Sequence, residues 1–470
     1  MNKSEKSTAI RALKILNTVG IAAAFSAGWF LCYIRESAVP ITPAGRWLFP
    51  VLMLLLYVMF ARIYDGFAVS LHRISEIIGS QILAAILADA ILYAVISILA
   101  QRFASVLPML AVLLAQCGLI VAWTTLVHGW YFKNYPPKRS AIIYDSRRGM
   151  EDLIGEYGLE KKFRILVTAS VDECLQDLGM LDGLETVFLS DLHSGDRNDI
   201  LKYCVMNGIS VYTIPRIGDV IMSGARRTHL FHLPILSVGR YRPTPEHAFV
   251  KRALDILISA AGLILLSPVL LLTALSIKLC DGGPVFYKQK RLTLNGRVFE
   301  ILKFRSMRVD AEKDGVARLS GGDQDTRVTS VGRVIRKVRI DELPQLLNVL
   351  KGDMAIVGPR PERPEIAREY EKTLPEFRLR LQVKAGLTGY AQVYGKYNTT
   401  PYDKLQMDLM YIANPGILND LSICIATIKV LFLPESTDGF QGEQPLETAQ
   451  TADYEGFEQK QSERETVGML

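Results

Sequence analysis

The chain has 470 residues, 49% of them hydrophobic, with a formal net charge of +6, so two or three domains are expected. Its six cysteines stand singly and its six histidines form no cluster with ligand spacing, which argues against a disulfide-bonded secreted protein and against a zinc protein. The hydrophobic excess lies in the first third of the chain and suggests membrane segments.

Four apolar segments long enough to cross a bilayer come first, near residues 15–34, 47–64, 81–100 and 107–130. Because further spans follow, the first is expected to be an anchor and not a cleaved signal peptide. Basic residues gather at the N-terminus, in the second loop and after the fourth segment, which places everything after Tyr135 in the cytoplasm. Asp89 is the only ionisable residue deep in a segment, so residues 1–135 are interpreted as an anchor and dimer platform and not a transport path.

Residues 136–240 change to short apolar runs that alternate with helical ones. AIIYDS, FRILVTA, TVFLS and SVYTIP have the character of strands, with helices such as DECLQDLGML and NDILKYCVMNG between them. This rhythm predicts a Rossmann-like α/β domain with a parallel sheet. The first strand is followed by YDSRRGMEDLIG, which lacks the dinucleotide-binding glycines, so a ligand site, a spacer and a contact surface all stay open.

A fifth apolar run, residues 251–280, has basic residues on both sides and Ser267-Pro268 at its centre. Proline kinks a helix, and a neighbouring serine hydroxyl can satisfy a freed carbonyl. A re-entrant hairpin would keep both basic flanks in the cytoplasm, whereas a fifth transmembrane helix would separate them. Both readings fit the residues, and a cytosolic substrate would favour the hairpin.

The segment RIDELPQLLNVLKGDMAIVGPRP carries adjacent carboxylates, Asp341 and Glu342, before an apolar helical pattern. The leucines at helical spacing predict one buried face: Leu343, Leu346, Leu347 and Leu350. A capping role would have Asp341 accept a bond from the second or third following N–H. The third is Pro344, which has no N–H, and this weakens the capping interpretation without removing it.

Basic residues surround this acid pair. Arg336 and Arg339 would keep nearby carboxylates ionised, as a nucleophile or a metal ligand requires. Arg360 lies in a proline-stiffened loop, where its planar guanidinium suits a phosphate. An acid pair with arginines beside a membrane indicates phosphoryl chemistry with Mg²⁺.

The order of several motifs is specific to one family. The motifs are KRALD, SP, GGPVFYKQKR, FEILKFRSM, RVTSVGRVIRKVRIDELPQLLNVLKGDM, VGPRP, KAGLTGYAQVYG and LMYI. Over about residues 245–433 the chain resembles the bacterial polyprenyl-phosphate sugar-1-phosphate transferases, the large monotopic phosphoglycosyltransferases that start capsule, exopolysaccharide and O-antigen assembly. The resemblance implies a membrane protein with a four-helix transmembrane bundle, a degenerate Rossmann-like middle domain and a mainly α catalytic domain. Its re-entrant membrane helix would be bent at Ser267-Pro268.

The resemblance also implies residue roles. Asp341 would be the nucleophile and Glu342 its partner, and both would serve as ligands of the Mg²⁺ cofactor. The residues implied in substrate binding are Arg336, Arg360, Pro359, Pro361, Lys251, Arg252, Lys303 and Arg305. Ala355, Ala385 and Gly416 depart from the usual family residues, but none of them touches the acid pair.

The implied reaction transfers a sugar-1-phosphate from a UDP-sugar to undecaprenyl phosphate through a covalent aspartate intermediate, with release of UMP. The implied partners are these two substrates, the lipid bilayer and a second copy of the chain, without nucleic acid. The implied location is the bacterial inner membrane, with the catalytic domain facing the cytoplasm. A non-catalytic scaffold of a polysaccharide assembly complex is the alternative, and neither the sugar nor the polysaccharide follows from the motifs. Residues 434–470 are polar and acidic and are expected to be disordered.

Overall fold

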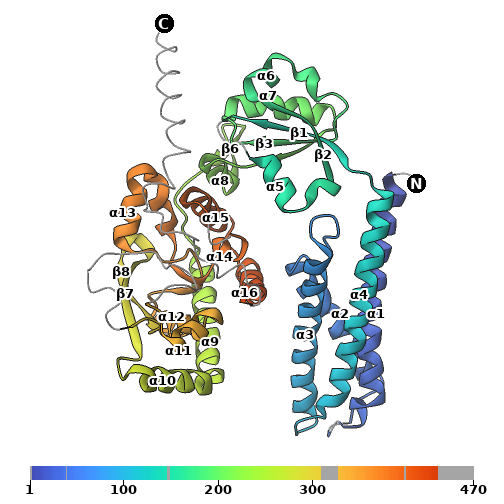
Figure 1. Cartoon of the computed structure of the whole chain (residues 1–470), viewed down its shortest axis with the longest axis vertical. Coiled ribbons are helices and arrows are strands. Elements are labelled where there is room, and N and C mark those ends of the chain that lie inside the picture. The colour runs from blue at the N-terminus through green and yellow to red at the C-terminus, as the bar shows by residue number, and fades with distance from the viewer. Residues whose placement is uncertain are drawn as a thin grey trace. The chain divides into compact units, whose positions relative to one another are not determined.

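The computed structural model describes residues 3–36, 38, 40–145, 149–308, 327–395 and 399–431, and the predicted acidic tail of residues 434–470 lies outside them. The chain divides into two compact units, Met1–Ile214 and Pro215–Leu470. Figure 1 shows the elements of each unit, which are described separately.

The first unit begins with the predicted four membrane-length helices: α1 (Lys3–Leu31), α2 (Leu48–Ile63), α3 (Ile74–Leu99) and α4 (Val106–Asn134). They pack as neighbours (Figure 1). Their inner faces bury large aromatic side chains such as Trp29 and Tyr57. Leu107 and Leu114, by contrast, stay exposed, as side chains that face lipid do. Short 3₁₀ turns, η1 (Tyr33–Arg35) and η2 (Gly45–Trp47), lie between α1 and α2.

Polar side chains inside the bundle bond to one another. The Tyr57 hydroxyl donates to Asn17 Oδ1 at 2.9 Å, and Asn17 Nδ2 donates to Gln81 Oε1 at 3.2 Å. Gln81 Nε2 donates in turn to the carbonyl of Gly66 at 2.7 Å. These bonds join α1, α2 and α3 at a place where an unpaired polar group would be costly. The apolar pattern of the sequence identified Asp89 but not these uncharged polar residues.

A parallel sheet follows the bundle, as the alternating pattern predicts. Its strands are β1 (Lys138–Tyr144), β2 (Phe163–Ser170), β3 (Thr186–Ser190) and β4 (Ser210–Thr213), in the order β2-β1-β3-β4. Ile143 and Leu189 pack with α6 (Val171–Gln176) and α7 (Ser194–Met206), whereas Ile142 and Phe188 pack with α5 (Met150–Glu156). Helices therefore cover both faces of the sheet (Figure 1). The 3₁₀ turns η3 (Leu159–Lys161) and η4 (Leu178–Leu181) complete this part.

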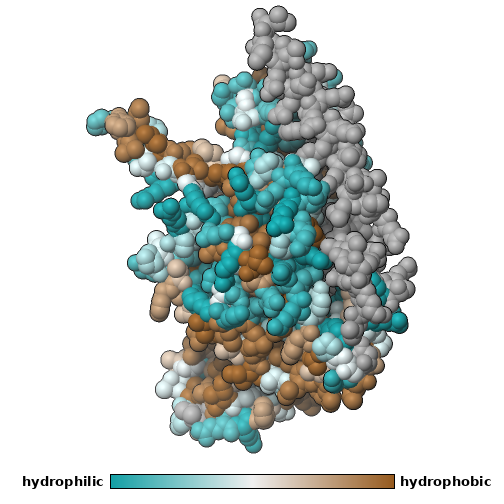
Figure 2. Space-filling model, turned by 90° about the vertical axis from the view of Figure 1, so that its left-hand side faces the viewer, coloured by the Kyte–Doolittle hydropathy of each residue, from teal (hydrophilic) through white to brown (hydrophobic). Residues whose placement is uncertain are grey.

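The second unit starts with α8 (Ile217–Ser223) and an antiparallel hairpin of β5 (Arg226–Leu230) and β6 (Leu233–Ser237). Two helices follow, α9 (Pro245–Leu265) and α10 (Ser267–Asp281), bent by 62° at the predicted Ser267-Pro268. The Ser267 hydroxyl donates to the Ile264 carbonyl at 2.8 Å, which satisfies an acceptor at the break. Leu265, Leu271 and Leu279 are exposed, and Figure 2 shows hydrophobic side chains gathered at the end of the unit where α10 lies.

The rest of the second unit is mainly helical, as predicted. Its strands are β7 (Phe286–Leu292) and β8 (Val298–Phe304), which form an antiparallel hairpin, and the short parallel pair β9 (Ala355–Val357) and β10 (Gly386–Thr388). Its helices are α11 (Ser330–Lys337), α12 (Gln345–Lys351), α13 (Pro364–Thr373), α14 (Tyr390–Tyr394), α15 (Pro401–Ala413) and α16 (Ile417–Leu431), with 3₁₀ segments η5 (Leu294–Gly296), η7 (Ile340–Glu342) and η8 (Pro375–Gln382). Val349, Met354 and Leu405 form the centre of one hydrophobic core.

The predicted buried face of the leucine-rich helix is partly wrong. The α-helix begins only at Gln345, after the 3₁₀ turn and Pro344, and Leu347 is 45% exposed. Val349 is instead fully buried. The tighter 3₁₀ turn changes the angular phase of the residues that follow it, so a pattern counted from Leu343 with the α-helical period selects the wrong face.

Candidate active site

The acid pair lies in a tight turn between α11 and α12. Arg339 has φ 54°, a left-handed conformation that turns the chain into the 3₁₀ segment η7. Asp341 and Glu342 are neighbours in this segment, where successive side chains point in different directions. Pro344 precedes α12, and no side chain caps that helix. The capping interpretation of Asp341 is thus excluded by its position.

Two cations bind the same oxygen of Glu342. Lys303 Nζ, from β8, and an Arg360 terminal nitrogen, from the loop after β9, each lie 2.9 Å from Glu342 Oε1. Burial by itself would raise the pKa of Glu342, but Arg360 and Lys303 outweigh it and hold that pKa well below its usual range. Glu342 is therefore ionised at neutral pH and holds both cations beside Asp341.

Asp341 has the opposite electrostatic balance. Its burial, and after that the negative charge of Glu342, raise the pKa of Asp341 to about 6, while Lys303, Arg336 and Arg360 act in the other direction. Over the described ranges, no side chain hydrogen-bonds its carboxylate. Asp341 is thus mostly ionised at pH 7 and more basic than an ordinary aspartate, as a nucleophile requires.

The predicted basic pair at the start of the membrane helix has structural contacts. Lys251 Nζ donates to the Val357 carbonyl at 3.2 Å and forms an ion pair with Asp420. The Arg252 guanidinium donates to two carbonyls in the last turn of α12, at 2.6 and 2.7 Å. Nearby, Asp255 accepts a bond from the backbone N–H of Ile356 at 3.0 Å. These contacts attach α9 to α12 and β9, and a substrate contact by Lys251 or Arg252 stays a prediction.

Two further arginines were predicted to bind substrate. Arg336 lies on α11, and its charge opposes the raised pKa of Asp341. Arg305 follows β8, is 7% exposed and packs against Gly283, where an added Cβ would lie 1.9 Å from its guanidinium. Arg336 therefore acts on the acid pair electrostatically, whereas Arg305 packs tightly against the loop after α10.

The loop Gly358-Pro359-Arg360-Pro361 is held through its carbonyl groups. Its prolines have no N–H, so carbonyl oxygens are the main anchors for this stretch. Four consecutive carbonyls, from residue 359 to residue 362, accept hydrogen bonds from Gly386 N (2.9 Å), an Arg380 terminal nitrogen (2.8 Å), an Arg291 terminal nitrogen (3.2 Å) and Leu292 N (2.9 Å). The backbone of Arg360 is therefore fixed from both sides while its side chain, 44% exposed, extends to Glu342.

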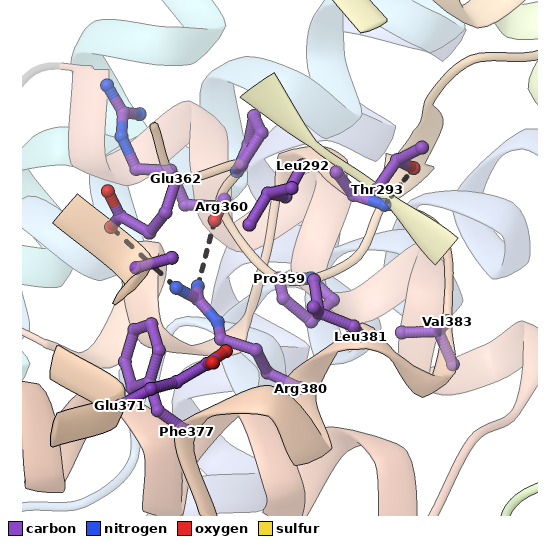
Figure 3. Close-up of a pocket in the computed structure, with 13 residues that line it drawn as sticks. Leu292, Thr293, Pro359, Arg360, Glu362, Glu371, Phe377, Arg380, Leu381 and Val383 are labelled. Carbon is purple, nitrogen blue, oxygen red and sulfur yellow. Dashed lines mark hydrogen bonds and ion pairs between the residues drawn. The ribbon is translucent and has the colours of Figure 1, made fainter. Parts of the chain in front are cut away.

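A small space lies against this loop. Figure 3 shows it between the loop and the side chains of Phe377, Arg380 and Val383. Its volume is about 10 Å³, room for about one water molecule. A nucleotide does not fit there, so a substrate would have to approach Arg360 from the exposed side of its guanidinium.

Sequence reasoning missed the side chains behind the loop. Arg380 and Asp408 are 4% and 1% exposed, and their charged groups lie 2.7 Å apart. Asp408 stands in LQMDLMYI, a charge within the buried apolar stripe of α15 that includes Leu405 and Leu409. A charged residue on a core face is itself a signal of a buried partner, and that signal was available in the sequence.

The acid pair also bears on the predicted metal. Among the residues that the structure describes, no three His, Cys, Asp or Glu side chains could hold a metal ion by themselves. Mg²⁺ is commonly bound by one or two carboxylates and completed by substrate phosphates and water. The negative charge of Glu342 is the second cause of the raised pKa of Asp341. A cation bound at Asp341 would offset that charge. The donor set fits such a shared site.

Comparison with known proteins identifies the second unit. A family described as bacterial sugar transferase matches residues 246–434. A UDP-N-acetylgalactosamine-undecaprenyl-phosphate N-acetylgalactosaminephosphotransferase of Aeromonas hydrophila is 38% identical over 260 residues, 54% of this chain and 60% of that protein. A galactosyl transferase, CpsE, of Streptococcus agalactiae is 42% identical over 198 residues, 40% of this chain and 43% of that protein.

A UDP-glucose:undecaprenyl-phosphate glucose-1-phosphate transferase of Caulobacter vibrioides is 41% identical over 191 residues, 40% of this chain and 71% of that protein. The matched part thus covers less than two thirds of the Aeromonas and Streptococcus proteins and more than two thirds of the Caulobacter protein. With its four membrane-length helices and bacterial relatives, the chain is a bacterial membrane protein. It belongs to the bacterial sugar transferase family.

Proposed function

We propose that the protein transfers a sugar-1-phosphate from a UDP-sugar to undecaprenyl phosphate and releases UMP, as the first membrane step of capsule, exopolysaccharide or O-antigen synthesis. The observation that carries this proposal is the acid pair, in which a buried Asp341 with a raised pKa lies beside a Glu342 held by Lys303 and Arg360. The relatives are named for transfer of N-acetylgalactosamine, galactose and glucose units. The class of donor is therefore part of the proposal, and the individual sugar is not.

The reaction takes two displacements at one phosphorus. The Asp341 carboxylate attacks the phosphorus that bears the sugar, the bond to the UMP oxygen breaks, and an acyl phosphate of the sugar forms on Asp341. A phosphate oxygen of undecaprenyl phosphate then attacks that phosphorus, and Asp341 leaves as a carboxylate. Arg336 and Arg360 offset the negative charge of the diphosphate that the carboxylate must approach. Mg²⁺, held by Asp341 and Glu342, would supply further charge neutralisation.

The bent helix pair suits a lipid substrate. We place α9 and α10 as a re-entrant hairpin whose exposed leucines enter one leaflet, with the acid pair at head-group depth on the cytoplasmic side. UDP-sugars are cytosolic, so the donor and the lipid phosphate would meet at this surface. We also propose that the parallel sheet belongs to a Rossmann-like domain and that the protein assembles as a homodimer. Chemical crosslinking in native membranes tests the dimer.

A direct assay tests the activity. Membranes that contain the protein are supplied with undecaprenyl phosphate, Mg²⁺ and each of a panel of UDP-sugars, and UMP release and lipid-linked sugar are measured. One productive UDP-sugar supports the proposal. A folded, membrane-bound protein that releases no UMP from any of them would favour the scaffold alternative.

A further inference from the structure

Arg380 lies behind the active-site loop and contacts it from inside the protein. Its terminal nitrogen donates to the carbonyl of Arg360 at 2.8 Å, and the same nitrogen lies 2.7 Å from Asp408. A second terminal nitrogen lies 3.7 Å from Glu362, and the guanidinium is 4.8 Å from the centre of the Phe377 ring. Figure 3 shows this side chain extending toward the backbone of the loop and toward Glu362.

The burial of Arg380 is informative because a charged group is costly to remove from water unless it is paired. Asp408 is equally buried, so the two charges pair with each other and also fix the guanidinium plane. A second arginine, Arg291, donates to the next carbonyl of the loop, that of Pro361. A buried and a half-buried guanidinium group, those of Arg380 and Arg291, thus hold successive carbonyls of a loop whose prolines leave few N–H groups for other anchors.

The other end of Arg360 reaches the acid pair. Its guanidinium lies 2.9 Å from Glu342, and its charge opposes the raised pKa of Asp341. A shift of the Arg360 backbone would move this charge away from both carboxylates. The contacts from Asp408 through Arg380 to the Arg360 carbonyl form one continuous path from the core of the unit to the reacting groups.

We propose that Arg380 is a positioning residue for the reaction: with Asp408, it sets the place from which the Arg360 guanidinium acts on Glu342, on Asp341 and on the diphosphate of the donor. The inference rests on the proposed function. Arg380 itself does not touch substrate in this arrangement. The competing interpretation is that Arg380 only stabilises the fold.

The experiment compares full-length variants in lipid nanodiscs, with UDP-sugar, undecaprenyl phosphate and Mg²⁺. Arg380→Lys keeps a positive charge but cannot span both Asp408 and the Arg360 carbonyl with a planar fork. We expect kcat to fall by roughly 10- to 100-fold, as for a small misplacement of catalytic groups, with little change in KM for undecaprenyl phosphate.

Arg378→Lys is the matched control, since Arg378 lies on the same 3₁₀ segment and is exposed. The decisive comparison is the double variant with Arg360→Ala. If Arg380 acts through Arg360, Arg380→Lys should cause no further loss in that background, whereas independent effects would multiply. Arg380→Met/Asp408→Leu replaces the buried pair by apolar groups, a change that often preserves folding, and it should reproduce the loss of kcat.

The outcomes separate the two proposals. If wild type and Arg378→Lys release UMP but Arg380→Lys keeps the wild-type kcat, or multiplies the loss caused by Arg360→Ala, the positioning role is overturned and the activity stands. If the folded wild type releases no UMP from any UDP-sugar, the proposed function is overturned and this inference goes with it.

Discussion

At the scale of single residues, the site depends on two neighbouring carboxylates with different surroundings. Glu342 accepts two cations on one oxygen, and these hold its pKa well below the usual range against the effect of burial. Asp341 is buried beside that negative charge, and its pKa is raised to about 6. Because the same cations act directly on Glu342 and only at longer range on Asp341, one carboxylate is suited to organising charge and the other to attack.

The first prediction concerns the nucleophile. Asp341→Asn should abolish transfer, because an amide cannot form the acyl phosphate, while membrane insertion and the unfolding temperature stay close to those of wild type. UMP release and membrane fractionation measure the two properties. Glu365→Asn is the control, because Glu365 is exposed. Wild-type turnover by Asp341→Asn would end the nucleophile assignment.

The second prediction concerns pH. Attack needs ionised Asp341, so kcat/KM should rise with pH through an apparent pKa near 6, a value that belongs to the coupled pair. Glu342→Gln removes the negative charge that is the second cause of the raised pKa of Asp341, but it leaves burial, the first cause. The rise of kcat/KM should therefore move to lower pH without reaching the pKa of an ordinary aspartate. The pH profiles of wild type and variant measure this. A rise that moves to higher pH would contradict the assigned electrostatics.

At the scale of elements, a helix break and a close approach at a strand pair decide where the site lies. The α9–α10 break places one helix against α12 and β9 through Lys251 and Arg252 and leaves the other with exposed leucines. β9 and β10 form a parallel pair, and Gly358, the residue after β9, lies so close to β10 that a Cβ on Gly386 would be 2.1 Å from the Gly358 nitrogen. The loop of Arg360 leaves the sheet at this close approach.

The third prediction concerns the break. Single cysteines at exposed Phe249 and Lys290, in a background with all six native cysteines replaced by serine, should both react with an impermeant maleimide from the cytoplasmic side only. A re-entrant hairpin returns both flanks to the side they started from. Inverted and right-side-out vesicles distinguish the two sides. Labelling of one flank from the outside would establish a fifth spanning helix.

The fourth prediction concerns the close approach of Gly386 to Gly358. Gly386→Ala should separate β9 from β10, lower the free energy of unfolding by about 1–3 kcal/mol, as overpacking does, and reduce UMP release at temperatures where the protein is folded. Gly416→Ala is the control, since nothing lies within 4 Å of the added Cβ. Thermal unfolding and turnover are measured together. Equal stability and turnover of the two variants would show that the protein tolerates an added methyl group at this close approach.

At the scale of the whole molecule, the family match and the compact unit do not begin at the same residue. The match starts at residue 246, whereas the second unit starts at Pro215. α8 contributes Val220 to the core of that unit, and a Cβ on Gly224 would lie 2.9 Å from Ala413 of α15. The motifs of the reaction thus lie on a body that also needs α8.

The fifth prediction follows from this boundary. A chain of residues 215–470 should insert into membranes and release UMP from the donor that the full chain uses. A chain that starts at Thr244 should keep the acid pair but unfold at lower temperature, because it lacks Val220 and α8. Turnover and thermal unfolding of both measure this. A folded, membrane-bound 215–470 chain without turnover would mean that the first unit contributes to the site.

The sequence by itself determined what depends on neighbours along the chain. Apolar runs determined the four membrane-length helices, alternating patterns determined the parallel sheet, and Ser267-Pro268 determined the place of the 62° bend. The acid pair and the proline-flanked Arg360 were recognisable as motifs. Hydrophobic length, strand alternation and proline chemistry act over a few residues, so they can be recognised before any folding is known.

Only the tertiary structure decided which charges meet. Glu342 receives Lys303 and Arg360, which come from 39 residues before it and 18 residues after it. Arg380 and Asp408 pair behind the loop, and the buried side of α12 is set by the turn that precedes it. Such pairings depend on how separate elements pack, because burial makes an unpaired charge too costly and thereby selects partners that sequence distance does not reveal.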